Sequence, residues 1–221
     1  MSMQVRNWWR VRAVTAGLVT IVLGTAAPAR AGVPSDQLRV QVDRVVSILD
    51  DTELRKSVRA AERRAAIRRI ANEIFDFTET SQRALGPHWQ ARTPAERDEF
   101  TGLFADLLER PYIGKIELYN GESVAYLGDK VDGDFATVRT KLVTKQGTEI
   151  PIVYRMLRRG DHWLVYDVSI EGVSLVANYR AQFNKIIQTS GYASVVQRLR
   201  DKQIEGVQAD APPAKVTSER R

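Results

Sequence analysis

Four apolar segments joined by short turn signals constrain the fold of this chain more than any other feature of its sequence. The segments are rich in β-branched and aromatic residues, which favour β-strands. They span residues 124–131, 135–144, 148–157 and 162–170. The turn signals between them are Asp132-Gly133, Gln146-Gly147 and Arg159-Gly160-Asp161. Because strands joined by short turns pair with their neighbours in sequence, we predict a four-stranded antiparallel meander. Pro151 indicates an edge or irregular portion within its strand.

Apolar residues at helical spacing predict helices on both sides of these strands. The helix signals are, in chain order, apolar stripes over residues 38–49 and 67–77, a capping box of Thr93 and Glu96, an N-cap at Ser174 and a break at Gly191. Pro111 is expected to interrupt the helix that follows the capping box, because proline has no backbone N–H to donate.

This order of elements predicts an α+β fold in a single domain. A sheet with one apolar face must be covered, and the flanking helices are the cover that the chain offers. We therefore expect the antiparallel meander to be wrapped by N-terminal and C-terminal helices around an apolar cavity, in a cone of the NTF2-like or cystatin-like kind. The domain is expected to span residues 32–205. A disordered tail rich in alanine, proline and charge is expected over residues 206–221.

Residues 1–31 have the pattern of a secretory signal peptide. Three arginines precede an apolar run over residues 13–24, and Ala29 and Ala31 stand where a signal peptidase reads small residues. We predict export with cleavage after Ala31, because the run is too short to span a bilayer. An uncleaved membrane anchor is the alternative, and the helix-breaking Pro28 argues against it.

Charge and composition narrow the class of protein. Four of the 33 basic residues and none of the acidic ones lie in the leader, so the remaining chain carries 29 basic and 27 acidic residues. This balance is not that of a nucleic-acid-binding protein. Without cysteine, an exported domain must be stabilised by its core alone. Seven basic residues gather between positions 55 and 69, and we interpret them as a solvated helix face; a docking surface for an acidic partner or lipid headgroups is the alternative.

Side chains that would form a catalytic or metal site are sparse. The two histidines lack metal-ligand spacing, so we expect no metal. Ser174 lacks the second glycine of a nucleophile elbow. We expect no cofactor and no enzymatic activity. One enzyme alternative stays open, in which Asp167 with Tyr154 or Tyr166 supplies a base and an oxyanion donor for proton transfer on an apolar substrate.

Residues 163–183 carry the most specific pattern in the chain. The pattern is Trp163-x-x-Tyr166-Asp167-Val168, then Glu171-Gly172-Val173-Ser174-Leu175-Val176, then Asn178-Tyr179-Arg180-x-x-Phe183. This stretch closely resembles the MlaC family, also called the toluene-tolerance or phospholipid-binding family, at every hallmark position. The segments that look like the family's central helical region are Leu85-Gly86-x-x-Trp89, Thr93-Pro94 with Phe100, Leu107-Leu108 and Tyr112. The resemblance covers nearly the whole mature chain.

The resemblance implies a periplasmic lipid carrier without catalytic activity. Members of the family bind glycerophospholipid with the tails buried and the headgroup exposed. They shuttle it between an outer-membrane lipoprotein complex and an inner-membrane ABC transporter that bears an MCE-domain protein, which maintains outer-membrane lipid asymmetry. A related branch is associated with hopanoids, so a hopanoid or another apolar lipid is the alternative cargo. An interaction adaptor without cargo is a further hypothesis. We expect the protein to act as a monomer.

The residues expected to line the lipid site are large apolar or aromatic side chains on the inward faces of helices and strands. They are Phe104, Leu108 and Tyr112 from the central helices, Val138, Leu142, Tyr154, Tyr166 and Val168 from the sheet, and Val173, Tyr179 and Phe183 from the motif. Ordinary core packing is the alternative role for each of them. Glu171, Asn178 and Arg180 are expected to fix the turn from strand to helix by hydrogen bonds, with a contact between Arg180 and a lipid phosphate as the alternative.

Overall fold

The computed structural model describes residues 33–204, so the predicted leader and tail lie outside the described residues. The helices are α1 (Pro34–Asp50), α2 (Ala60–Ile74), α3 (Phe77–Leu85), α4 (Pro94–Ile116), α5 (Leu175–Ser190) and α6 (Tyr192–Arg200). Two short 3₁₀ turns are η1 (Ser57–Arg59) and η2 (Gly86–Trp89). The strands are β1 (Ser123–Asp132), β2 (Phe135–Val143), β3 (Glu149–Arg159), β4 (His162–Ile170) and β5 (Val173–Ser174).

The strands form the antiparallel meander that the turn signals predict, in the order β1-β2-β3-β4-β5. The sequence predicts four strands, and the structure adds the two-residue β5. Ile170 of β4 pairs with Val173 of β5 across a turn of Glu171 and Gly172, whose φ angles are 52° and 85°. Two successive residues with positive φ suit a type I′ turn, whose twist matches that of the paired strands. The predicted α+β fold class is confirmed.

Pro151 lies where β3 runs past the end of β4. The last pair between these strands is Ile152 with Ile170, so Pro151 has a strand neighbour on one side only, Lys141 of β2. The Pro151 carbonyl accepts a hydrogen bond from the Glu171 N–H at 2.9 Å. The predicted edge portion is therefore present, within a strand that is otherwise central.

Helix α4 begins as predicted but does not break where predicted. The Thr93 N–H donates to Glu96 Oε2 at 2.8 Å, and the Glu96 N–H donates to Thr93 Oγ1 at 3.3 Å, which completes the capping box. The helix continues through Pro111, so the predicted interruption is wrong. Leu107 and Tyr112, on either side of the proline, both pack against apolar clusters. Tertiary packing thus outweighs the one backbone hydrogen bond that proline removes.

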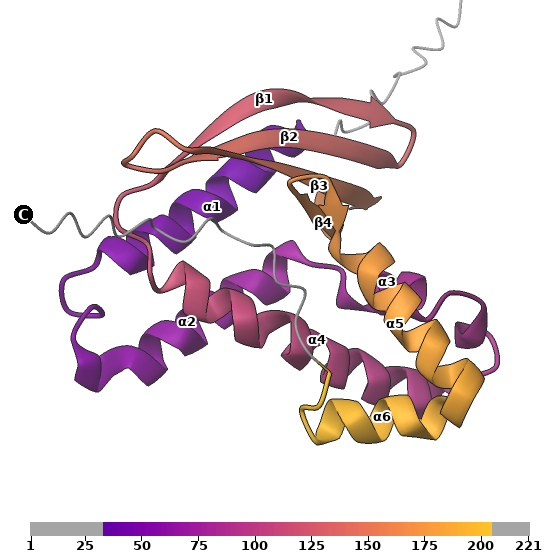
Figure 1. Cartoon of the computed structure of the whole chain (residues 1–221). Coiled ribbons are helices and arrows are strands. Elements are labelled where there is room, and N and C mark those ends of the chain that lie inside the picture. Colours follow the sequence, from indigo (N-terminus) through magenta and orange to yellow (C-terminus); the bar gives the residue numbers. More distant parts are fainter. Residues whose placement is uncertain (1–32, 205–221) are drawn as a thin grey trace, which may run out of the picture.

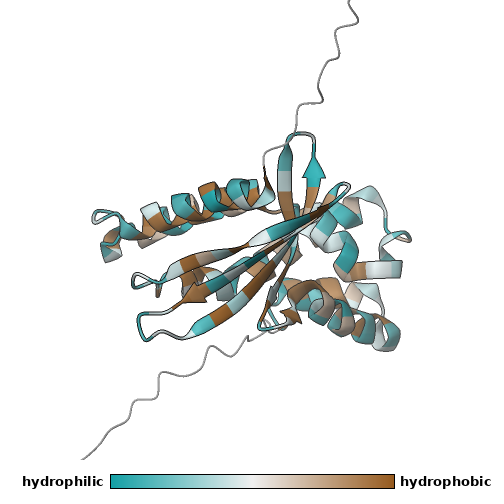
Figure 2. Cartoon of the chain, turned by 90° about the horizontal axis from the view of Figure 1, so that it is seen from above, coloured by the Kyte–Doolittle hydropathy of each residue, from teal (hydrophilic) through white to brown (hydrophobic). Residues whose placement is uncertain are grey.

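The helices lie together on one side of the sheet, as Figure 1 shows. Helix α1 lies against the sheet and contacts β1, β2 and β4, while α2, α3 and α5 reach β4. Helix α4 packs against α2, α3 and α6. In the view from above, apolar and polar residues alternate along the strands (Figure 2), as expected of a sheet with one face on the core.

The apolar interior of the described residues forms two clusters. The helical cluster joins α3, α4, α5 and α6, and its buried members are Ala84, Leu85, Trp89, Phe100, Phe104, Leu107, Val176, Tyr179, Phe183, Val195, Leu199 and Ile204. The sheet cluster joins α1 to the inward face of the sheet, and its buried members are Leu38, Ala136, Val138, Met156, Trp163, Val165, Val168 and Leu175. Aromatic rings 5.2–5.9 Å apart fill the helical cluster, so it forms the closely packed part of the fold.

Candidate functional site

Apolar side chains that are only half-buried surround the sheet cluster. We call this set the apolar rim: Val42, Ile74, Phe75, Tyr112, Tyr126, Ile152, Tyr154 and Ile170. Its members come from α1, α2, α4, the sheet and the link that follows α2. In a closed core such side chains are fully buried, as Phe104 and Tyr179 are in the helical cluster. The apolar rim therefore offers accessible apolar surface to an apolar ligand, and a smaller half-buried set of Leu103, Leu108, Ile186, Ile187 and Tyr192 borders the helical cluster.

Tyr154 of β3 combines a deep position with accessible surface. Burial raises the pKa of its hydroxyl to about 12, because a phenolate there loses its hydration. The side chain is nevertheless only half-buried. Its strand neighbours on the same face are Val138 of β2 and Val168 of β4, both of them buried. Tyr154 therefore presents accessible aromatic surface between two buried valines, at the centre of the sheet face that carries the apolar rim.

Tyr126 of β1 places an unsatisfied polar atom in the same rim. Its hydroxyl is buried and has no hydrogen-bond partner among residues 33–204. Burial, and next the nearby Tyr154, raise the pKa of this hydroxyl. A buried hydroxyl without a partner costs about 1–3 kcal/mol. Such a group calls for a partner that the protein itself does not supply, for example a ligand or an ordered water.

The structure divides the predicted lining residues between the two clusters. Val138 and Val168 belong to the sheet cluster, and Tyr112 and Tyr154 pack against it. Phe104, Tyr179 and Phe183 belong to the helical cluster, and Leu108 packs against that one. Tyr112 and Tyr179 lie within electrostatic reach of one another, so the two clusters meet at these tyrosines.

Three predicted lining residues lie apart from both clusters. Leu142 is half-buried on the same face of β2 as Val138, four residues further along the strand. Tyr166 packs against the Phe135 ring and beneath the Arg83 guanidinium. The side chain of Val173 is exposed. Tyr166 therefore does not face the sheet cluster, whereas Val173 shares the face of its partner Ile170 but lies exposed beside it.

The predicted lining set omits six members of the rim, four of which are related to one another or to predicted core residues by strand pairing or helical spacing. Tyr126 pairs with Thr140 of β2, and Thr140 pairs with Ile152 of β3, which in turn pairs with Ile170 of β4. Side chains of paired residues share a face, but irregularities between Tyr126 and Gly128 and between Arg155 and Met156 shift the register set by the turns, so the turn signals alone do not place Tyr126 and Ile170 on this face. The fourth, Val42, lies one helical turn after Leu38 on α1.

The turn from the sheet into α5 is held by Asp167 and Ser174. The Asp167 carboxylate accepts hydrogen bonds from the Ser174 hydroxyl at 2.7 Å and the Val176 N–H at 3.1 Å, and it pairs with Arg155 at 3.0 Å. Ser174 Oγ in turn accepts from the Ala177 N–H at 3.0 Å, which confirms the predicted N-cap. Glu171 contributes its backbone to this turn, as described above for Pro151.

Asn178 and Arg180, which the sequence predicts to fix this turn by hydrogen bonds, lie elsewhere. The Asn178 amide oxygen accepts from Gln182 within α5 at 2.7 Å, which leaves the turn untouched. Arg180 lies across the η2 turn: a Cβ on Gly86 would stand 2.8 Å from Arg180 Nε, and the φ of Gly86 is 55°. Only glycine therefore lets the guanidinium lie there.

The residues of the enzyme alternative are not brought together. The Asp167 carboxylate is engaged by hydrogen bonds from Arg155, Ser174 and Val176. Asp167 lies opposite Arg155 in the sheet, so its side chain shares a face with Arg155, whereas the neighbouring Tyr154 points to the other face. Tyr166 is engaged by Phe135 and Arg83. Within residues 33–204, no group of three or more His, Asp or Glu side chains is placed to hold a metal ion.

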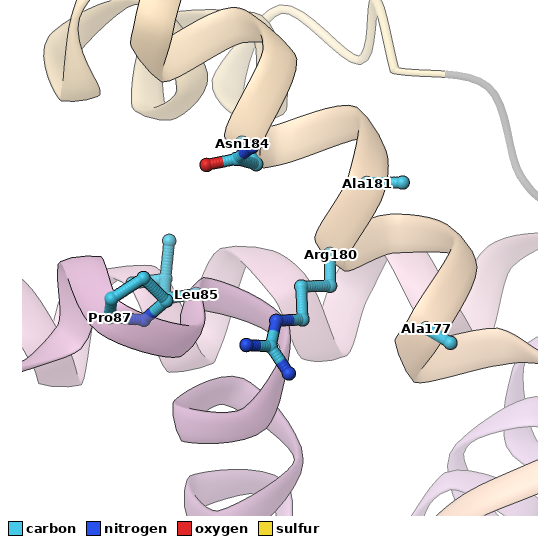
Figure 3. Close-up of a pocket in the computed structure, with 6 residues that line it drawn as sticks. All are labelled: Leu85, Pro87, Ala177, Arg180, Ala181 and Asn184. Carbon is cyan, nitrogen blue, oxygen red and sulfur yellow. The ribbon is translucent and has the colours of Figure 1, made fainter.

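A shallow pocket of about 370 Å³ lies between α5 and η2. Figure 3 shows Leu85 and Pro87 on one side and four residues of α5 on the other, namely Ala177, Arg180, Ala181 and Asn184. His88 Nε2 lies 2.9 Å from Asn184 Oδ1 beside it. The pocket is on the outer side of α5, and none of its lining residues belongs to the apolar rim.

The basic segment before and along α2 is largely neutralised by ion pairs. Arg63 and Arg64 bind Glu117 at 2.8 and 2.9 Å, and Arg68 binds Glu109 at 2.5 Å. The remaining pairs in this segment are Arg68–Asp106, which also reaches α4, and Arg55–Asp50, Lys56–Glu53 and Arg59–Glu62. These contacts tie α2 to α4 and support the interpretation as a solvated helix face.

Comparison with known proteins places these features in a family. Residues 39–201 match the MlaC protein family. The chain is 25% identical over 152 residues to the toluene tolerance protein ttg2D of Pseudomonas putida, a match that covers 68% of each protein. It also superposes, with a TM-score of 0.68 and 26% sequence identity, on the phospholipid-binding protein of Ralstonia solanacearum in complex with a phospholipid; this match covers 76% of the chain and 96% of the Ralstonia chain.

The match extends from α1 to the end of α6 and includes every element that forms the apolar rim. No helix within residues 33–204 has the length and apolarity that crossing a membrane requires. With the meander, the covering helices and the motif of residues 163–183 all in place, the chain belongs to the MlaC family.

Proposed function

We propose that this protein is a periplasmic carrier that holds a phospholipid by its acyl tails against the apolar rim. It acts as a monomer, released from its leader by cleavage after Ala31. It carries lipid between an outer-membrane lipoprotein complex and the MCE-domain protein of an inner-membrane ABC transporter, and so maintains the lipid asymmetry of the outer membrane. The apolar rim is the observation that carries this proposal. The phospholipid-bound Ralstonia protein of the same fold supports it.

The physical chemistry of lipids explains why such a carrier is needed. Each CH₂ group exposed to water costs about 0.8 kcal/mol, so two long acyl tails cost on the order of 20 kcal/mol or more. Free lipid therefore crosses an aqueous compartment very slowly. A protein that covers the tails with apolar side chains removes most of this cost. No covalent step is needed, which agrees with the structural use of Asp167.

Recovery of cargo from the purified protein tests the proposal. The full-length chain is produced in cells, the periplasmic fraction is purified, and native mass spectrometry is followed by lipid extraction. We expect a monomer carrying glycerophospholipid, and delipidated protein that takes up phospholipid from vesicles. A hopanoid in the extract would replace phospholipid as the cargo. Protein that is lipid-free after gentle purification and takes up no lipid would contradict the proposal.

Two adjacent residues of β3 provide a matched pair of variants. Ile152 belongs to the apolar rim, whereas Val153 is also half-buried but points to the opposite face. A carboxylate in the rim repels acyl tails because it loses hydration beside them. We therefore expect Ile152→Glu to abolish lipid uptake and Val153→Glu to retain it, with thermal unfolding showing that both variants fold.

A further inference from the structure

Polar groups gather at one end of the apolar rim, where α1 meets β1. The Tyr126 hydroxyl is buried there without a partner among the described residues. The Arg39 guanidinium of α1 lies over the ring of the same tyrosine, with its central carbon 4.4 Å from the ring centroid. Arg39 is exposed, and no acidic group of residues 33–204 lies within ion-pair distance of it. The Arg39 guanidinium at the surface and the buried Tyr126 hydroxyl beside it are thus two neighbouring donors without a protein acceptor among the described residues.

Other Arg–Tyr stacks in the protein differ in this respect. Arg83 lies 4.1 Å from the Tyr166 centroid and pairs with Glu79 at 2.8 Å. Arg92 lies 4.4 Å from the Tyr192 centroid and pairs with Glu96 at 3.2 Å. In both stacks an acidic side chain of the protein neutralises the guanidinium. The stack of Arg39 on Tyr126 has no such ion pair, although Asp43 lies within electrostatic reach of Tyr126, and it borders the apolar rim, so the Arg39 cation is available to an anion from outside.

We propose that this end of the apolar rim recognises the polar region of an ester-linked glycerophospholipid. The Tyr126 hydroxyl donates a hydrogen bond to an ester carbonyl, and Arg39 pairs with the phosphate. The order of groups from surface to interior is cation, hydroxyl donor and apolar rim. A glycerophospholipid presents phosphate, ester carbonyls and tails in the same order. This inference rests on the proposed carrier function and adds to it a preference for ester-linked phospholipids over lipids without ester carbonyls or phosphate.

The hydrogen bond from Tyr126 is tested by comparing two lipids that differ only in the ester carbonyls. Delipidated protein is mixed with vesicles containing equal amounts of diester and diether phosphatidylethanolamine of the same chain length, and the bound lipid is counted by native mass spectrometry. We expect the wild-type protein to enrich the diester lipid about 3- to 10-fold, as one hydrogen bond supports. The enrichment is expected to disappear in Tyr126→Phe and to persist in Tyr166→Phe, which removes the hydroxyl of the Arg83 stack.

The ion pair of Arg39 is tested with diester phosphatidylethanolamine against diacylglycerol, which has the esters but no phosphate. We expect Arg39→Gln to weaken phospholipid uptake about 2- to 10-fold, as a partly exposed charge pair supports, and to leave diacylglycerol uptake unchanged. Arg83→Gln, in the matched stack, is expected to change neither.

The outcomes separate this inference from the carrier function. Equal binding of diester and diether lipid by the wild-type protein, or a preference that survives in Tyr126→Phe, would overturn the inference while leaving the carrier intact. Uptake of neither lipid would overturn both. The comparison of the two lipids on the wild-type protein needs no variant, so it holds even if a substitution disturbs folding.

Discussion

Asp167 illustrates how one side chain fixes the geometry of the whole motif. It is buried, and its three hydrogen bonds join β4, β3 and the first turn of α5. The sequence shows an aspartate in a family motif but does not show which backbone group it caps. Because the sequence does not show the hydrogen-bond partners of Asp167, it leaves a role as a catalytic base open. A buried carboxylate serves catalysis or structure depending on those partners.

Removing this carboxylate should destabilise the fold. In Asp167→Ala the Val176 N–H and the Ser174 hydroxyl lose a buried acceptor, which we expect to lower the free energy of unfolding by about 2–4 kcal/mol. Urea unfolding followed by circular dichroism measures the change. Asp98→Asn, on the exposed side of α4, is the control and is expected to change stability by less than about 0.5 kcal/mol. A loss in Asp167→Ala no larger than in the control would show that the carboxylate is not structural.

Glu117 gives the stability a predictable pH dependence. Hydrogen bonds from Arg64 and Arg63 lower its pKa below the ordinary 4.5. Because the folded pKa is the lower one, the stabilisation is complete above the ordinary value and is lost as pH falls through the lowered pKa. We therefore expect the wild-type protein to be more stable than Glu117→Gln near neutral pH and the difference to vanish in acid. Urea unfolding over a pH series checks this, and a difference independent of pH would refute it.

Among the secondary-structure elements, two glycine-to-alanine substitutions are expected to change stability in opposite directions. Gly86 has a φ of 55° and Arg180 lies against it, so Gly86→Ala meets both backbone strain and a side chain. We expect a loss of about 1–3 kcal/mol. Gly102 lies within α4 with nothing within 4 Å of an added Cβ, so Gly102→Ala should stabilise the protein by about 0.5–1 kcal/mol. Thermal unfolding distinguishes the two signs, and a stabilising Gly86→Ala would refute the packing of Arg180.

Elements whose ends are marked by local chemistry were predictable, and those decided by packing were not. The turn glycines place β1 to β4 within two residues of their predicted bounds, and the capping box places the start of α4. The predicted interruption at Pro111 is wrong because the effect of a proline on a helix depends on the neighbouring elements that hold both halves of the helix in place. β5 was too short to carry a strand pattern of its own.

At the scale of the whole molecule, the sequence predicts that the interior is apolar but not that it has two parts. Residues of one apolar stripe, such as Tyr112 and Leu108 on α4, are neighbours in sequence yet pack against different clusters. The way α4 packs against α2, α3 and α6 decides which cluster each residue joins (Figure 1). We therefore propose that the lipid tails lie against the apolar rim and that the helical cluster is the scaffold.

Photo-crosslinking of a bound phospholipid that carries a photoreactive group in its acyl tail tests this assignment most directly. Peptide mass spectrometry then locates the crosslinked residues. We predict crosslinks in the strands and helices of the apolar rim, at Tyr112, Ile152, Tyr154 or Ile170. Crosslinks confined to the pocket between α5 and η2 would contradict this assignment.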